Sequence, residues 1–388
     1  MRGPCYQRTG FRSPLGNRRW RLVLIGLVAV TTCCVLALSY RGPRSVHPQP
    51  PSVNNSFGQF PAYTEAERAL AKMLTGRDED VDLGLANWLI VADIPQFADM
   101  TREAYFRTLD CMVEQVRQDM AKRREVAIYK GKNPNDPDVR CSIFCGSIVA
   151  LGFDYAEEFR QHDLTPQQSL ALHGDGDRIF FAGLLRTRRG TCVSMPLVYL
   201  VIGQSLGMPV HLVAIGKHYF VRWQEPGYRM NIEATIVDRV AVTPDDSVYL
   251  EDEGLTKEQL RGSEMRNLTR QEVLAQLFFV RSGFWVMGAE KSLSRSLVDL
   301  SRAYHLAPDG PAIQNARQGI FARYGVTPTD TLSTLQEKER RVMRQLFQEP
   351  QQRQAGIQPP PSPTHLPATP AGLTPQRLQQ RPPATTPR

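Results

Sequence analysis

Arg189-Gly190-Thr191-Cys192-Val193-Ser194-Met195-Pro196 places a cysteine between a glycine turn and the start of a long apolar run. The residues from Leu197 to Leu206 continue at helical spacing, and Pro196 fits the first turn of a helix, where a missing N–H does little harm. Gly207 is suited to close this helix. We therefore predict Cys192 at a helix N-terminus, where the helix dipole and unpaired N–H groups favour the thiolate over the thiol.

Three short strands are predicted directly after this helix. Residues 210–215 form an apolar strand, and residues 218–223 alternate, so that His218 lies on one face of the second strand. Glu225-Pro226-Gly227 is typical of a hairpin turn, and residues 228–235 return as the third strand. The pattern predicts an antiparallel sheet beside the helix.

The side chains on these strands offer partners for Cys192. Asn231 and Glu233 share a face of the third strand, so one of them can lie beside His218 across the ladder. A cysteine, a histidine and an acceptor that orients the imidazole form the arrangement used in thiol-based acyl transfer. His211 is a competing base, although its strand neighbours favour a structural or surface role. The backbone N–H of Cys192 is the single oxyanion donor that the sequence indicates.

A cysteine at the start of an apolar helix is, taken alone, most often a buried core residue. The glycine turn before it, His218 on one strand and Glu233 on the next together favour a catalytic site. Cys192, His218 and Glu233 are therefore the candidate catalytic residues, and we expect neither a cofactor nor a metal ion.

The order of these three residues resembles the transglutaminase-like, papain-like cysteine superfamily. The resemblance implies that Cys192 is the nucleophile, His218 the general base and acid, and Glu233 the orienting carboxylate. Most members have aspartate at that last position, although the run Asn231 to Thr235 (NIEAT) is similar to one subfamily. Some close relatives have proline in place of the cysteine, so a catalytically inactive module is the alternative.

The residues before the candidate site are predicted to be helical. Helices are indicated near residues 64–76, 83–90, 101–124 and 139–151. Residues 82–90, 109–117 and 143–153 resemble the N-terminal helical part of a bacterial transglutaminase-like family, whose members often carry tetratricopeptide-type repeats behind the core.

The predicted fold class is α+β. It has a papain- or transglutaminase-like core, with N-terminal helices and a central helix bearing the cysteine packed on an antiparallel sheet. This domain is expected at residues 62–250. Helical periodicity resumes at Leu268, and residues 251–348 resemble a tetratricopeptide-like segment.

Both ends of the chain differ from this core. Residues 22–40 are uncharged and apolar, and as a helix they span roughly 28 Å, close to the thickness of a bilayer core. Six arginines precede them and two closely follow, which predicts that residues 1–21 are a cytoplasmic tail and that the main domain is extracytoplasmic. A cleaved signal is the alternative. Prolines indicate a linker at 41–61 and a disordered tail at 349–388.

The formal net charge of +8 does not indicate nucleic-acid binding, because the excess lies in the ends. Residues 1–64 contribute +8 and residues 350–388 contribute +4, whereas the middle has 35 basic and 39 acidic residues. Of the seven cysteines, four lie in this middle part without a paired Cys-x-x-Cys pattern, so a structural zinc site is not predicted.

We therefore expect a membrane-anchored extracytoplasmic protein that acts on amide bonds of protein or peptide substrates. Water as acceptor makes such a protein a peptidase or amidase, and an amine makes it a transglutaminase. The alternative is a catalytically inactive scaffold that uses the C-terminal helices to hold a protein partner.

Overall fold

The computed structural model describes residues 64–156, 158, 172–216, 218–235, 243–288, 291–327, 330 and 333–342. All of them fall in the first of the two units into which the chain divides, residues 1–342. The predicted segments at 1–21, 22–40, 41–61 and 349–388 lie outside the described residues. Within the described ranges, no helix combines the length and apolar character needed to cross a bilayer.

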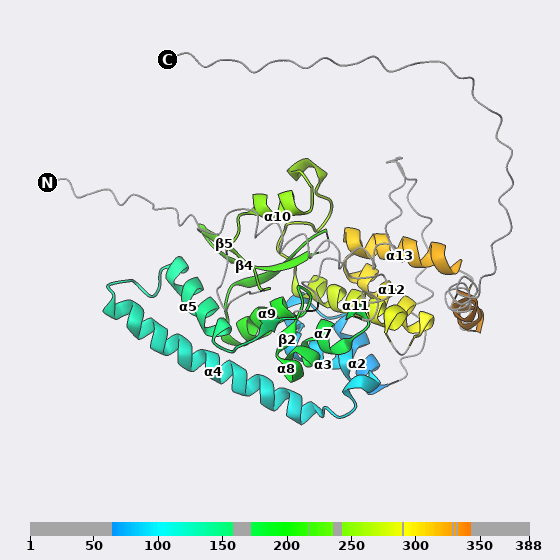
Figure 1. Cartoon of the computed structure of the whole chain (residues 1–388), viewed down its shortest axis with the longest axis horizontal. Helices are drawn as coiled ribbons and strands as arrows, with labels where there is room; N and C mark the ends of the chain where they lie inside the picture. The colour runs from blue at the N-terminus through cyan, green and yellow to red at the C-terminus, as the bar shows by residue number, and fades with distance from the viewer. Residues whose placement is uncertain are drawn as a thin grey trace, which may run out of the picture. The chain divides into compact units, whose positions relative to one another are not determined.

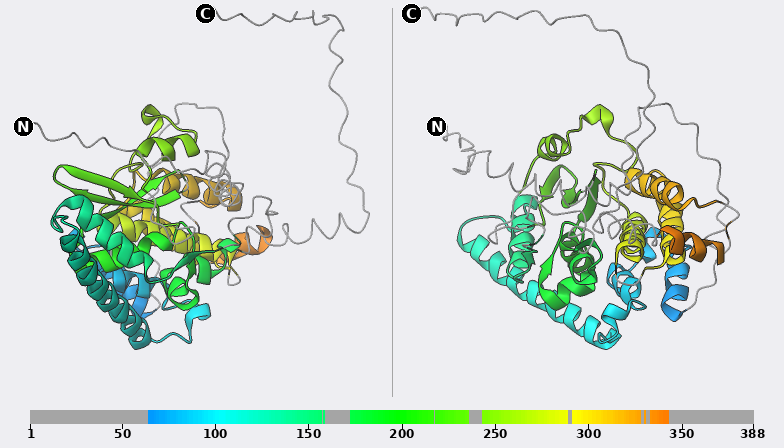
Figure 2. Two further views of the ribbon diagram at one scale, coloured as in Figure 1. Left: turned by 60° about the vertical axis from the view of Figure 1, so that its left-hand side comes forward. Right: turned by 45° about the vertical axis from the view of Figure 1, so that its right-hand side comes forward.

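The four helices predicted before the cysteine stretch are present in the structure. Each of the first three begins behind a side-chain cap. Oxygens of Thr64, Asp82 and Thr101 accept hydrogen bonds of 3.0–3.2 Å from N–H groups three residues further on. These caps satisfy N–H groups that have no partner in the first turn of a helix. The long α4 lies at the edge of the described unit with α5 beside it (Figure 2). The bounds are α2 Glu65–Met73, α3 Leu83–Val91, α4 Arg102–Tyr129 and α5 Pro137–Val149.

A parallel pair of two-residue strands, β1 and β2, leads into the helix behind the cysteine. This helix, α9, is buried from Met195 to Gly203, as its continuous apolar sequence requires. It ends at Gly207, whose φ of 65° is the left-handed conformation that glycine adopts readily. The bounds are β1 Asp154–Tyr155, α7 Gly176–Ile179, α8 Phe181–Thr187, β2 Arg189–Gly190 and α9 Met195–Leu206.

The three predicted strands form one antiparallel sheet in the order β3-β4-β5. Ile215 pairs with His218 across β3 and β4, and Arg222 pairs with Asn231 across β4 and β5. The turn between β4 and β5 contains Gly227 with φ 74°. The strands span β3 Val210–Ile215, β4 His218–Glu225 and β5 Tyr228–Ile232.

The two faces of this sheet pack against different helices (Figure 1). Leu212 and Val221 belong to the main hydrophobic core together with the buried residues of α9. On the opposite face, Val213, Ile215 and Phe220 form a smaller core with residues of α10, Asp246–Asp252. This follows from the alternation of side chains along a strand.

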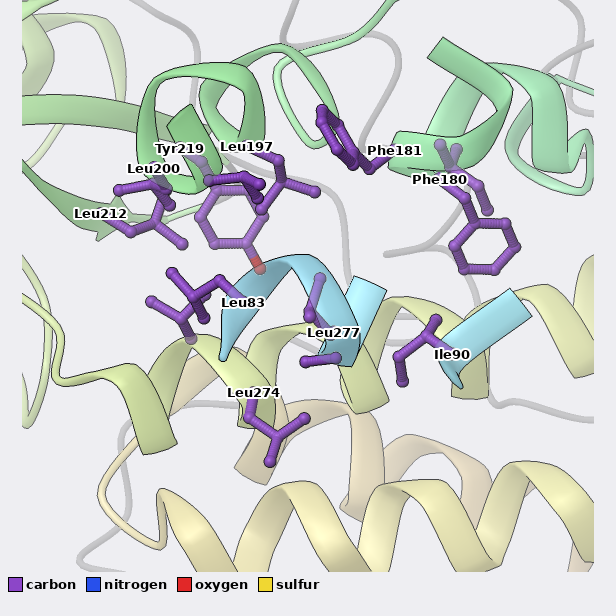
Figure 3. Close-up of a cluster of buried hydrophobic side chains, with 14 of the residues drawn as sticks. Leu83, Ile90, Phe180, Phe181, Leu197, Leu200, Leu212, Tyr219, Leu274 and Leu277 are labelled. Carbon is purple, nitrogen blue, oxygen red and sulfur yellow. The ribbon is translucent and has the colours of Figure 1, made fainter. Parts of the chain in front are cut away.

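The helices after residue 250 share the main core with the N-terminal helices. Figure 3 shows Leu83 and Ile90 of α3 between Leu197 on one side and Leu274 and Leu277 of α11 on the other. Residues of α12 and α13 belong to the same core. The tetratricopeptide-like interpretation of residues 251–348 and the domain limit at residue 250 stay predictions. The bounds are α11 Arg270–Met287, α12 Leu293–Leu306 and α13 Pro311–Tyr324.

A buried group of charges joins α2, α11 and α12. Arg281 is 1% exposed and donates to both carboxylate oxygens of Asp299, at 2.8 and 2.6 Å. It also pairs with Glu67 at 3.0 Å, and Arg302 bonds to Glu67 as well. Buried charges that lose a partner are strongly destabilising, so this group holds the three helices in one arrangement.

Candidate active site

Cys192 lies in a tight turn immediately before α9. The prediction placed it at the N-terminus of the helix, and α9 itself begins three residues later, at Met195. The Met195 N–H donates to the Thr191 carbonyl at 2.9 Å, so the backbone already makes one helical turn around the cysteine. The Val193 N–H instead bonds to the Thr191 hydroxyl at 3.2 Å. This side-chain bond competes with regular helix and delays its start.

Gly190 and Ser194 fix the shape of this turn. The Ser194 hydroxyl accepts from the Thr191 N–H at 3.0 Å and donates to the Arg178 carbonyl at 2.8 Å. A Cβ on residue 190 would lie 2.6 Å from the Ser194 Oγ, so only glycine fits there. The Cys192 N–H has no hydrogen bond to another residue of the described part of the chain, which leaves it as the predicted oxyanion donor.

His218 and Glu233 meet on the face of the sheet that carries α10. His218 is the first residue of β4, and Glu233 follows directly after β5. The Val221–Ile232 pairing places Glu233 diagonal to His218 rather than opposite it. The distance between His218 Nε2 and Glu233 Oε2 is 2.8 Å. The sequence-based choice of Glu233 as a neighbour of His218 therefore agrees with this contact.

The Glu233 carboxylate receives hydrogen bonds on both oxygens. Oε1 accepts from the Thr235 N–H at 2.9 Å and from its hydroxyl at 2.6 Å. Oε2 accepts from the Tyr249 hydroxyl at 3.3 Å in addition to His218. Donors to a carboxylate favour its charged form, so Glu233 is held as an anion although it is only 8% exposed.

The electrostatics of this pair are set by its burial and its partners. Burial opposes a charge on the imidazole, but Glu233 and Cys192 outweigh it and raise the pKa of His218 well above the ordinary 6.5. Burial also opposes the Glu233 charge, yet His218 and Thr235 hold the pKa of Glu233 below the ordinary 4.5. Both shifts favour an imidazolium beside a carboxylate.

Cys192 also acts on His218, which has one ring nitrogen that is not bound to Glu233. Nε2 is bound to Glu233, and Nδ1 is buried without a hydrogen-bond partner in the described ranges. Because Cys192 contributes directly to the raised pKa of His218, its sulfur lies within reach of the imidazole. The structure thus brings the three predicted residues together in the order cysteine, histidine, carboxylate.

The two competing residues do not contact His218. Asn231 accepts from Arg222 Nε at 2.8 Å and donates to Asp246 at 2.8 Å, so its amide is engaged elsewhere. His211 on β3 pairs with Arg222, whereas Ile215, four residues further along β3, pairs with His218. Four residues of a strand span about 13 Å, so His211 lies about that far from the pair of Ile215 and His218. Burial and the charge of Arg222 lower the pKa of His211.

Tyr249 is the residue of this site that the sequence interpretation missed. Its ring lies 5.8 Å from the His218 ring at an angle of 23°, and its hydroxyl bonds to Glu233. Tyr249 is separated from Glu233 by a segment with no recognisable pattern, so no local signal marks it.

The three other cysteines that the structure describes are outside the site. Cys111 is an exposed free thiol, and Cys141 and Cys145 are buried free thiols with sulfurs 3.9 Å apart. In the part of the chain that the structure describes, no three His, Cys, Asp or Glu residues are grouped closely enough to hold a metal ion.

Comparison with known proteins identifies a domain around this site. Residues 103–279 match the family model described as the transglutaminase-like superfamily. The matched range contains Cys192, His218 and Glu233. No curated protein and no solved structure gives a match. Residues 103–279 are therefore similar to the transglutaminase-like superfamily, and the structure there mixes helices and sheet, whereas the bacterial subfamily stays a prediction.

Proposed function

We propose that this transglutaminase-like domain acts on amide bonds of protein or peptide substrates through Cys192, His218 and Glu233. The observation that carries the proposal is the placement of His218. Its Nε2 is bound to a carboxylate that is itself fully hydrogen-bonded, while Nδ1 is left for Cys192. This is the arrangement in which an imidazole can move a proton to and from a thiol.

The reaction proposed for this geometry has two halves. His218 accepts the Cys192 proton, and the sulfur attacks the amide carbonyl to give a tetrahedral oxyanion beside the Cys192 N–H. The imidazolium then protonates the leaving amine, the C–N bond breaks and a thioester remains. Glu233 holds the ring orientation and stabilises its positive charge in both steps.

The second half determines the product. His218 removes a proton from the acceptor, which attacks the thioester and releases the thiol. Water as acceptor gives hydrolysis, and a primary amine gives acyl transfer. Mass analysis of a glutamine-containing peptide incubated with and without a primary amine separates the two, because both release ammonia from the side-chain amide. Hydrolysis then adds about 1 Da, and transfer adds the mass of the amine less that of ammonia.

The test uses the reactivity of the thiols. We expect iodoacetamide to modify Cys192 faster near neutral pH than Cys111, Cys141 or Cys145, although Cys111 is exposed and Cys192 is 4% exposed. Peptide mass spectrometry of the full chain follows each cysteine separately. Cys192→Ala should lose both the fast modification and the amide chemistry. Equal slow modification of Cys192 and the buried pair would contradict an activated thiol.

The burial of the site favours a second candidate function. Cys192, His218 and Glu233 are 4, 5 and 8% exposed. A closed site of this kind suits an inactive module that binds a protein partner with its helices. In that case Cys192→Ala leaves binding of the partner unchanged, and neither hydrolysis nor amine transfer is detected with wild type.

The proposal also includes membrane attachment through residues 22–40, with the domain on the extracytoplasmic side. Its support is the uncharged apolar run of 19 residues and the arginines that precede it. Resistance of the full chain to extraction from membranes by alkaline carbonate, together with cleavage of the domain by protease added outside the cell, tests it. Release into the soluble fraction would favour a cleaved signal.

A further inference from the structure

Two cross-strand pairs lie one behind the other on the α10 face of the sheet. The first is His218 with Glu233. The second is Arg222 with Asn231, which are direct register partners and share a 2.8 Å hydrogen bond from Arg222 Nε to the Asn231 amide oxygen. Phe220 lies between them on β4 because side chains alternate along a strand. A single short helix contacts both pairs.

Tyr249 connects α10 to the first pair. Its ring is stacked on Phe220, with centroids 3.9 Å apart and an angle of 7°. The same ring lies beside the His218 ring, and the hydroxyl donates to Glu233 Oε2 at 3.3 Å. Tyr249 is 2% exposed, so it excludes solvent from the imidazole and the carboxylate on this side.

Asp246 connects the same helix to the second pair. Its Oδ1 accepts from Arg222 Nη2 at 2.9 Å and from Asn231 Nδ2 at 2.8 Å. Arg229 of β5 pairs with its other oxygen. Arg222 is 2% exposed and also donates to the Met265 carbonyl at 2.9 Å. A buried guanidinium with several partners holds a fixed geometry. Arg222 therefore fixes the first turn of α10 on the sheet through Asp246.

We infer that α10 is a positioning element for the catalytic pair, in which the Arg222–Asp246 contact holds the helix so that Tyr249 orients Glu233 and covers His218. This inference rests on the proposed function. Tyr249, Asp246 and Arg222 act through other residues and are positioning residues. Because Asp246 and Tyr249 are three apart on one helix, they share a face and reach both pairs together.

The hydroxyl of Tyr249 gives the inference a distinctive signature. A donor to a carboxylate favours the charged form, so its removal raises the pH below which Glu233 becomes protonated. The titratable groups that act directly on Glu233 are Tyr199 on α9, His218 on β4, and Tyr249 and Asp252 on α10. Cys192 before α9 acts on His218, and Arg222 and Asp246 act on Tyr249.

The experiment measures the rate of Cys192 alkylation against pH in the full chain. Tyr249→Phe keeps the stacked ring and removes only the hydroxyl, so it is expected to fold. The rate of Cys192 alkylation in this variant should fall about three- to tenfold, which corresponds to the loss of one ordinary hydrogen bond. The acidic limb of its pH–rate profile should move to higher pH. Asp246→Asn should change the rate and the acidic limb in the same directions as Tyr249→Phe. Val248→Ser, on the exposed side of the same helix, should match wild type.

Coupling between the two contacts completes the test. If both act through the position of α10, the double variant Asp246→Asn with Tyr249→Phe should lose less than the product of the two single losses. Fast alkylation in wild type with an unchanged rate and pH profile in Tyr249→Phe overturns the positioning role and leaves the proposed function standing. Slow alkylation of Cys192 in wild type overturns both.

Discussion

Replacing Glu233 with glutamine removes the charge that faces His218 while keeping nearly the same shape. The carboxylate lies 2.8 Å from Nε2, and both residues are at most 8% exposed. A hydrogen bond to a charged group contributes about 1.5–3 kcal/mol and a neutral one about 1 kcal/mol. The substitution should therefore remove about 1–2 kcal/mol from the interaction with the imidazolium.

This loss has a kinetic consequence. The pKa of His218 should fall in Glu233→Gln, because the imidazolium loses the carboxylate that helps to raise it. The same energy makes the alkylation of Cys192 about 5- to 30-fold slower. Glu225→Gln is the matched control, because that carboxylate is on the same hairpin and bonds to Trp223 and Arg140 instead.

The same pair predicts how stability depends on pH. The pKa of His218 is raised, so its contribution is complete below about 6.5 and is lost as pH rises through the folded value. The pKa of Glu233 is lowered, so its contribution is complete above about 4.5 and is lost as pH falls through the folded value. The difference in unfolding free energy between wild type and Glu233→Gln should be largest between about pH 4.5 and 6.5.

Urea unfolding followed by circular dichroism over a pH series measures this difference. A stability gap that does not change between pH 5 and pH 9, or an alkylation rate equal to wild type, would refute the role given to Glu233. The Glu225→Gln control should show no maximum in this range.

Three further substitutions test the scaffold around the site. Gly190→Ala places a Cβ 2.6 Å from the Ser194 Oγ, so it should reduce the unfolding free energy by about 1–3 kcal/mol and slow Cys192 alkylation. Asp299→Asn weakens the main partner of buried Arg281 and should reduce the unfolding free energy by about 3 kcal/mol in urea titrations. Thr101→Ala removes the cap of α4 and should reduce it by about 1 kcal/mol without affecting alkylation.

Thr101→Ala also serves as the stability control for Gly190→Ala. If both slow the alkylation of Cys192 in proportion to their loss of stability, the effect of Gly190 is general rather than local. An Asp299→Asn protein as stable as wild type would contradict the account of the buried charges.

The position of Cys192 could be predicted only approximately. Helical periodicity correctly indicated α9 and its end at Gly207, because an apolar run with a terminal glycine is a local signal. The start of α9 was placed too early, since the Thr191 and Ser194 side chains bond to nearby backbone groups. Whether such a hydroxyl bonds to the backbone depends on rotamers that a residue pattern does not contain.

The choice between Asn231 and Glu233 was also open in the sequence. Both lie on the same face, and strand alternation does not distinguish them. In the structure it is Glu233 that contacts His218, because the register of β4 and β5 places the two diagonally across the strands. Asn231 is instead bonded to Arg222 and Asp246. Register depends on pairing between strands, so it is not contained in the pattern of a single strand.

The sequence by itself determined the local elements around the site: the capped helices, the glycine before Cys192 and the alternation that places His218, Phe220 and Arg222 on one face. These follow from propensities and periodicities within a few residues. The tertiary structure alone decided that α10 covers this face, that Tyr249 reaches Glu233 and that α11 packs on α3. These contacts join residues distant in the chain, and long-range packing leaves no local pattern for a sequence to show.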